Sequence, residues 1–205
     1  MFTSVRILSI IVRLKEGARF FLRVIAGTAR RTLLVAPAGV NTRPTADRAK
    51  ESLFSIIMNR LDGARFLDIF CGSGAIGIEA LSRGVKEATF VESALPALKA
   101  LKENLVKTKL TSSAYIIEET AEKALDRLAT EARQFDIIFL DPPYDTDLLS
   151  QTLAAIFNQN LLAQGGIIIA ETDKNHNEAP ASFHLYDTRE YGRAKFLFYS
   201  DNEAI

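Results

Sequence analysis

The stretch "RFLDIFCGSGAIGIEALSRG", residues 65–84, joins an apolar strand-like run to a glycine-rich turn and then to a helical pattern. The run at residues 66–70 is apolar except for Asp68, and the turn carries glycine at 72, 74 and 77. The pattern that follows repeats its apolar residues every three to four positions and ends at Gly84, a typical helix stop. A buried strand that passes directly into a helix is the opening unit of an α/β fold.

The same unit recurs towards the C-terminus. Further strand-like runs, rich in Ile, Val and Phe, occupy residues 87–92, 113–119, 135–141 and 165–172. Helical patterns separate them, at residues 95–109, 121–132 and 148–162. Continuous apolar runs between helices predict a mostly parallel, Rossmann-like sheet with helices on both faces. Residues 183–200 predict two strands around a Tyr-Gly turn, so we expect seven strands with an antiparallel hairpin at one edge.

The N-terminal part has a different pattern. Residues 22–27 and 31–37 predict a small β-hairpin, and a turn-rich linker leads to a helix for which Thr45 is the expected N-cap and Gly63 the expected stop. The first 21 residues are too short and too interrupted by charge for a signal peptide or a membrane span. We therefore expect an artefactual or poorly ordered extension at 1–21, a hairpin arm and linker at 22–44, and the main domain at 45–205.

Composition narrows the class of protein. The chain is 48% hydrophobic and 24% charged, which is typical of a soluble globular domain, and its one cysteine suits a reducing cytoplasm. The two histidines lie far from that cysteine in sequence, so no metal site is expected. Residues 1–65 carry 12 Lys and Arg against 4 Asp and Glu, and the remainder is acidic. The basic end predicts either a polyanion-binding arm or simply a solvated helix face. No long apolar stretch suggests an interface, so we expect a monomer.

The carboxyl ends of the predicted strands collect polar and glycine residues. In open α/β sheets this edge binds ligands, and glycines there allow close approach of a ligand to the backbone. The residues concerned are Asp68, Gly72, Ser73 and Gly74 after the first strand, Glu92 after the second, Glu119, Thr120 and Ala121 after the third, and Asp141 to Tyr144 after the fourth. Any one of these alone is typical of an ordinary turn, but their convergence predicts one ligand site.

Two nucleotide-like ligands fit this pattern. The spacing Gly-Ser-Gly-Ala-Ile-Gly at 72–77 matches a dinucleotide fingerprint, which allows NAD. However, Asp68 precedes the glycines, and an acid there suits a cationic ligand such as S-adenosylmethionine and repels a pyrophosphate. Glu92 is placed to accept hydrogen bonds from ribose hydroxyls, and Thr120 with Ala121 to contact an adenine edge. We therefore favour S-adenosylmethionine over NAD.

"DPPY", residues 141–144, predicts a site for an amino group. The Asp141 carboxylate and the Pro142 carbonyl can accept hydrogen bonds from an exocyclic amine and stabilise the charge that develops on its nitrogen. The two prolines restrict the backbone and so hold the carbonyl in place. Tyr144 offers a ring on which a base can stack, and a paired base must be extruded to reach this point.

"LDIFCGSGAIGIEALSRG" and "IFLDPPY" together resemble class I S-adenosylmethionine-dependent methyltransferases that modify exocyclic amino groups. With "RVIAG", "TRPTADRAKESLF" and "FVE", the chain is similar over roughly residues 22–200 to the bacterial family that methylates a guanine N2 amino group of 16S rRNA. The resemblance implies a 16S rRNA substrate, free or within a 30S particle, and catalytic roles for Asp141, Pro142 and Tyr144. The nearest enzymatic alternative is an adenine-N6 methyltransferase, and an NAD-dependent oxidoreductase and a non-catalytic RNA-binding scaffold are further ones.

The resemblance also assigns binding roles. Asp68 and the backbone from Phe70 to Gly74 are implied to hold the methionine part of the cofactor, with Thr45 closing that end. Glu92 is implied to bind the ribose, and Thr120 and Ala121 the adenine. The family often has Asp or Asn where this chain has Thr120, and Glu119 could substitute. RNA phosphates are expected to contact the basic arm and linker, at Arg23, Arg30, Arg31, Arg43 and Arg48.

Overall fold

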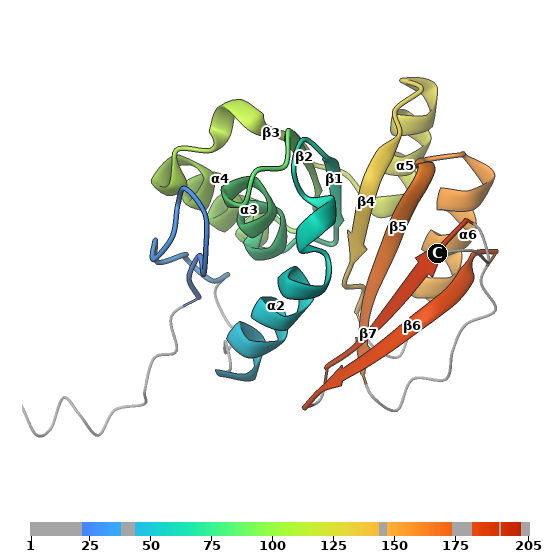
Figure 1. Cartoon of the computed structure of the whole chain (residues 1–205). Coiled ribbons are helices and arrows are strands. Elements are labelled where there is room, and N and C mark those ends of the chain that lie inside the picture. The colour runs from blue at the N-terminus through green and yellow to red at the C-terminus, as the bar shows by residue number, and fades with distance from the viewer. Residues whose placement is uncertain (1–21, 38–43, 144–146, 174–181, 193, 202–205) are drawn as a thin grey trace, which may run out of the picture.

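The computed structural model describes residues 22–37, 44–143, 147–173, 182–192 and 194–201, with the side chains of 44–47 excepted. One seven-stranded sheet runs through it in the order β3-β2-β1-β4-β5-β7-β6 (Figure 1). The strands are β1 Arg65–Ile69, β2 Glu87–Val91, β3 Ala114–Ile117, β4 Phe135–Leu140, β5 Leu162–Asp173, β6 His184–Tyr191 and β7 Ala194–Ser200. The first five strands are parallel, and β7 pairs antiparallel with both β5 and β6. The predicted α/β fold, with its antiparallel edge pair, is confirmed.

Helices cover both faces of this sheet, as the continuous apolar runs predicted. The helices are α2 Pro44–Ile56, α3 Ala75–Ser82, α4 Leu95–Thr108, α5 Ala121–Thr130 and α6 Leu148–Asn158, with short 3-10 turns at Met58–Arg60 and Thr111–Ser113. One hydrophobic cluster packs α2, α3 and α4 against one face. A second cluster packs α5 and α6 against the other face.

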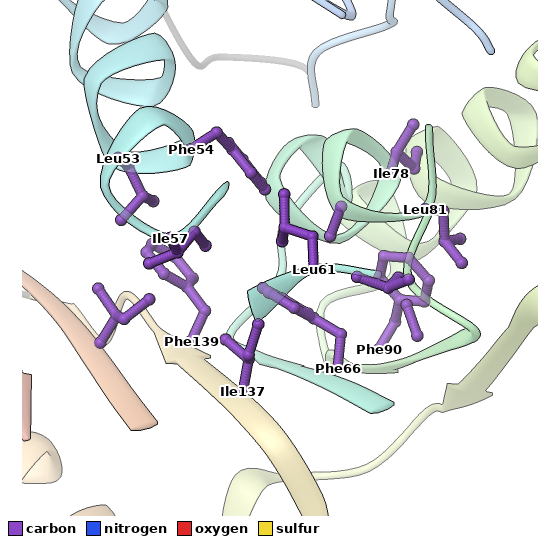
Figure 2. Packing of buried hydrophobic residues seen from close by; sticks show 14 of the residues in the cluster. Leu53, Phe54, Ile57, Leu61, Phe66, Ile78, Leu81, Phe90, Ile137 and Phe139 are labelled. Carbon is purple, nitrogen blue, oxygen red and sulfur yellow. The ribbon is translucent and has the colours of Figure 1, made fainter. Parts of the chain in front are cut away.

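The central strands β1 and β4 are buried on both faces, and alternate residues of each strand belong to the two clusters. Phe139 of β4 belongs to the α2–α4 cluster, whereas its neighbours Ile138 and Leu140 belong to the α5–α6 cluster. Figure 2 shows Phe139 of β4 next to Ile57, the residue after α2, and Ile137 of β4 next to Phe66 of β1. This alternation decides which face each polar residue at a strand end occupies.

The predicted N-terminal hairpin is a short antiparallel pair around the bridge between Arg23 and Leu33, with backbone hydrogen bonds from Leu34 to Leu22 and from Val24 to Thr32. The arm is nevertheless tightly attached. The backbone N–H groups of Ile25 and Ala26 donate to the two carboxylate oxygens of Glu79 in α3, at 2.8 and 2.9 Å. Val24 of the arm is buried in the α2–α4 cluster. Figure 1 shows the arm beside α3 and α4.

The helix after the linker differs from the prediction at both ends. It begins at Pro44, so Thr45 is a residue of its first turn and the expected N-cap role is wrong. Proline suits the first helical position because its missing N–H has no partner there in any helix. The helix ends at Ile56 rather than near Gly63, and a 3-10 turn then places Leu61 in the core.

Candidate active site

The strand order reverses between β1 and β4, which lie side by side with β2 on one flank and β5 on the other. Such a reversal opens a crevice at the carboxyl ends of the two central strands. The residue after β4, Asp141, donates its backbone N–H to the carbonyl of Ile69 at the end of β1, at 3.4 Å. The Asp-Pro-Pro turn and the glycine loop therefore start from the same point of the sheet.

The glycine loop between β1 and α3 has a backbone that few residue types adopt. Phe70, Gly72 and Gly74 all have positive φ angles, of 60°, 55° and 76°. A side chain at Gly72 would meet nothing within 4 Å, so this peptide faces open space, whereas one at Gly74 would clash with Leu101 of α4. Gly74 thus allows helix packing, while Gly72 leaves room for a ligand against the backbone.

Asp68 lies beneath this loop and is almost fully buried. One of its carboxylate oxygens accepts the backbone N–H of Gly77, at 2.9 Å. Burial raises the pKa of Asp68 to about 8, and the negative charges of Asp141 and Glu92 add to the increase, although the bond from Gly77 opposes it. A cationic group that bound here would favour the ionised carboxylate, so the site fits a positively charged ligand.

Glu92, the residue after β2, is oriented by backbone N–H groups. Its Oε2 accepts from Gly72 at 2.9 Å, and its Oε1 accepts from Ser93 and Ala94 at 2.8 Å each. A carboxylate has about four acceptor positions, so three are already used. Accepting two ribose hydroxyls requires that at least one of these bonds be exchanged, and the bond to Gly72 in the glycine loop is the nearest to the expected ligand.

At the end of β3 the chain turns into α5, with Thr120 as the exposed N-cap residue and Ala121 as the first helical residue. The Thr120 side chain makes no capping hydrogen bond. The carboxylate of Glu119 lies 3.7 Å from Arg127, which makes it less available as a substitute acceptor. The adenine-contact roles of Thr120 and Ala121 remain predictions, but their backbone groups do lie at this edge of the sheet.

Pro142 is buried and Asp141 is exposed to solvent, so the carboxyl group is accessible above a fixed turn. Enough protein surrounds this carboxyl that reduced hydration raises the pKa of Asp141 to about 7. Tyr144 and Arg43 lie outside the described residues, as does the side chain of Thr45. Figure 1 shows that α2 begins on the same side of the molecule as the carboxyl ends of β4 and β5.

The predicted phosphate-binding arginines that the structure describes lie in two parts of the chain, the N-terminal arm and α2. Arg23, Arg30, Arg31 and Arg48 are exposed. The arm turn that precedes Arg30 is attached to Ser82, the last residue of α3, through the bond from the Thr28 N–H to the Ser82 carbonyl at 2.8 Å. An eight-residue helix is about 12 Å long, so Arg30 and Arg31 lie about that far from the glycine loop. A role of these arginines in RNA binding stays a prediction.

Sequence reasoning missed two groups that matter here. Glu79 and Lys50 form a buried ion pair at 3.3 Å that holds the arm against α3, and Lys50 also donates to the carbonyl of Arg23 at 2.6 Å. Glu171, near the end of β5, has a raised pKa, to about 8, through burial and the negative charge of Asp141. The signal for Glu171 was present, because "IIIAE" ends an apolar run in an acid as "IIFLD" does.

The comparison with known proteins agrees with this geometry. Residues 22–200 match the protein family described as conserved hypothetical protein 95. The chain is 43% identical over 153 residues to "Putative rRNA methyltransferase YlbH" of Bacillus subtilis, which covers 75% of this chain and 83% of that protein. It is 37% identical over 161 residues to the ribosomal RNA small subunit methyltransferase D of Haemophilus influenzae, with coverages of 78% and 82%.

The fold is also similar to solved structures. The structure titled "Putative methyltransferase yhhF from Escherichia coli" superimposes with a TM-score of 0.75 and 31% identity, covering 88% of this chain and 97% of that one. Within the described residues, no helix has the length and apolar character needed to cross a membrane.

Proposed function

The chain belongs to the conserved hypothetical protein 95 family, and from that premise we propose that it transfers a methyl group from S-adenosylmethionine to the N2 amino group of a guanine in 16S rRNA. Relatives at 43% and 37% identity are named as rRNA methyltransferases. The observation that carries the proposal is the bond from the Asp141 N–H to the Ile69 carbonyl, which joins the amine-binding turn to the cofactor loop.

The residues around the glycine loop fit S-adenosylmethionine. The buried carboxyl of Asp68 favours a cation, Gly72 leaves space beside its backbone, and Glu92 reaches the loop from β2. When bound, this cofactor supplies an electrophilic methyl group on a positively charged sulfur. Asp68 and the peptides from Phe70 to Gly74 hold the methionine part, Glu92 the ribose, and Thr120 with Ala121 the adenine.

The Asp-Pro-Pro turn acts on the acceptor. The Asp141 carboxylate and the Pro142 carbonyl accept the two hydrogens of the amino group, which draws its nitrogen towards sp³ geometry and stabilises the charge that develops on it. Pro142 is buried, so its carbonyl is held without cost at the moment of reaction. Tyr144 provides the stacking surface for the extruded base.

The setting follows from the substrate. We place the enzyme in the bacterial cytoplasm, acting as a monomer on rRNA within a 30S subunit or an assembly intermediate. The exposed arginines of the arm and of α2, Arg23, Arg30, Arg31 and Arg48, contact phosphates outside the pocket, with Arg43 in the linker. Such contacts position RNA without reading its sequence.

The test is tritium transfer from labelled S-adenosylmethionine to 16S rRNA, both as naked RNA and as 30S particles, followed by nucleoside analysis. We expect label in N2-methylguanosine and a loss of about 100-fold or more in kcat for Asp141→Asn, with cofactor affinity retained. Asp62→Asn, an exposed acid before β1, is the matched control. Label in N6-methyladenine would replace guanine as the substrate, and no label in either RNA form would refute the proposal.

A further inference from the structure

Glu171, near the end of β5, is an acid that the proposed reaction does not use. In the β4–β5 ladder Phe139 pairs with Ile169 and Leu140 with Ala170, so the next position sets Asp141 beside Glu171. Phe139 and Ile169 both belong to the α2–α4 cluster, and alternation places Glu171 on that same face. Asp68 lies on this face too, because it contacts Gly77 of α3.

The carboxyl groups of Asp141 and Glu171 interact through their charges and lack hydrogen-bond donors among the described residues. The pKa of Glu171 is raised to about 8 by burial and then by the charge of Asp141. Among the described residues, no hydrogen bond or ion pair engages either carboxylate. Two neighbouring acids held in this way are unfavourable for the free protein unless a ligand supplies hydrogen-bond donors.

Glu171 lies next to a group of packed aromatic rings. Glu171 pairs with Phe196 of β7, whose ring lies 6.5 Å from that of Phe139 and 5.8 Å from that of Tyr191. Phe139 and Phe196 are buried, so these rings form a packed base beside Glu171 and leave its carboxyl as the group that a ligand can meet. A metal ion is a poorer occupant, since the described residues contain no group of three or more His, Cys, Asp or Glu arranged to hold one.

We propose that Glu171 is a specificity-determining residue of the acceptor site and accepts the N1–H of the target guanine, while Asp141 and the Pro142 carbonyl accept the N2 amino hydrogens. This inference rests on the proposed function and extends it to how the base is chosen. Guanine presents N1–H and N2–H side by side, and carboxylates on neighbouring strands, whose backbones are about 4.8 Å apart, can converge on two adjacent donors. Adenine presents an acceptor at N1 and gives Glu171 no hydrogen there, whereas the N1–H of guanine favours the ionised carboxylate and so offsets its raised pKa.

The test uses the RNA fragment that serves as methyl acceptor, made with either guanine or 2-aminopurine at the modified position. 2-Aminopurine keeps the N2 amino group but has an unprotonated N1. The wild type is expected to favour guanine by about tenfold or more in kcat/KM, the effect of losing a hydrogen bond to a charged acceptor. In Glu171→Gln the amide can donate to that N1, so the preference should shrink by about tenfold. Glu190→Gln, an exposed glutamate of β6, should keep the wild-type ratio.

Several outcomes would overturn the proposed role of Glu171 or the proposed function. An unchanged guanine to 2-aminopurine ratio in Glu171→Gln overturns the role of Glu171, and so does a loss of S-adenosylmethionine affinity as large as the loss of activity. If Glu171→Gln fails to fold, Glu171→Asp replaces it, and a ratio equal to that of the wild type despite the shorter side chain likewise overturns the role. A wild type that labels no guanine N2 refutes the proposed function itself, which is a distinct result.

Discussion

Asp68 provides the most quantitative test of the site, through the variant Asp68→Asn. The side chain is buried and keeps one hydrogen bond, from the Gly77 N–H to its Oδ2 at 2.9 Å. Asparagine has nearly the same shape, and its amide oxygen can accept the same bond. The substitution therefore removes the ionisable group and leaves the packing of α3 on β1 in place.

The magnitude follows from proton linkage. The pKa of Asp68 is about 8 in the folded protein and 3.8 is its ordinary value, so between these limits the folded state binds one proton more than the unfolded state. Because the pKa is raised, the stability that protonated Asp68 contributes is complete below pH 3.8. It is lost progressively as the pH rises to about 8. The slope is about 1.4 kcal/mol of unfolding free energy per pH unit, which amounts to about 3 kcal/mol between pH 5 and pH 7.

Urea unfolding at pH 5, 6 and 7 without cofactor measures this effect. The unfolding free energy of the wild type should fall relative to that of Asp68→Asn by about 3 kcal/mol across the range, whatever Asp141 and Glu171 contribute to both proteins. Asp62→Asn should run parallel to the wild type. Parallel curves for the wild type and Asp68→Asn would show that Asp68 is already ionised in the folded protein, and would refute the raised pKa of this carboxyl.

Other substitutions test the surroundings of the site. Gly77→Ala places a Cβ against the Phe90 ring and should lower the unfolding free energy by about 1–3 kcal/mol, measured by urea unfolding; wild-type stability would contradict the packing. Glu79→Ala removes a buried carboxylate that pairs with Lys50 and accepts the N–H groups of Ile25 and Ala26, and it should cost about 3–5 kcal/mol, with faster proteolysis within residues 22–37; an arm that stays resistant would refute this attachment. Calorimetry in two buffers of different ionisation enthalpy should show proton release when S-adenosylmethionine binds at pH 7, and none in Asp68→Asn.

Local patterns were sufficient for the order of the elements. The apolar runs that predicted the parallel strands became β1 to β5, because burial on both faces of a parallel sheet requires continuous apolar sequence and such runs are visible within five to seven residues. The same holds for the glycine loop, where positive φ angles at Gly72 and Gly74 need residues without a Cβ. Phe70 shares this conformation without that advantage, and no local pattern indicated it.

Helix ends and the arm were predicted less well. Thr45 was expected as a cap from residue type alone, but Pro44 begins the helix because its ring geometry already suits the first helical position. The arm forms a shorter hairpin than predicted, paired around Arg23 and Leu33, and the Glu79 carboxylate takes the backbone N–H groups of Ile25 and Ala26 that follow. A long-range acceptor thus completes the backbone hydrogen bonding where the local pairing ends.

The sequence alone determined which acids lie at the strand ends, because strand and loop boundaries depend on neighbouring residues. It therefore also placed Asp68, Glu92 and Asp141 at one edge of the sheet. Only the tertiary structure decided what each acid meets there. The β4–β5 register sets Asp141 beside Glu171, thirty positions away in the chain. Register and burial arise from contacts between distant segments, and these contacts set the charge state of each acid.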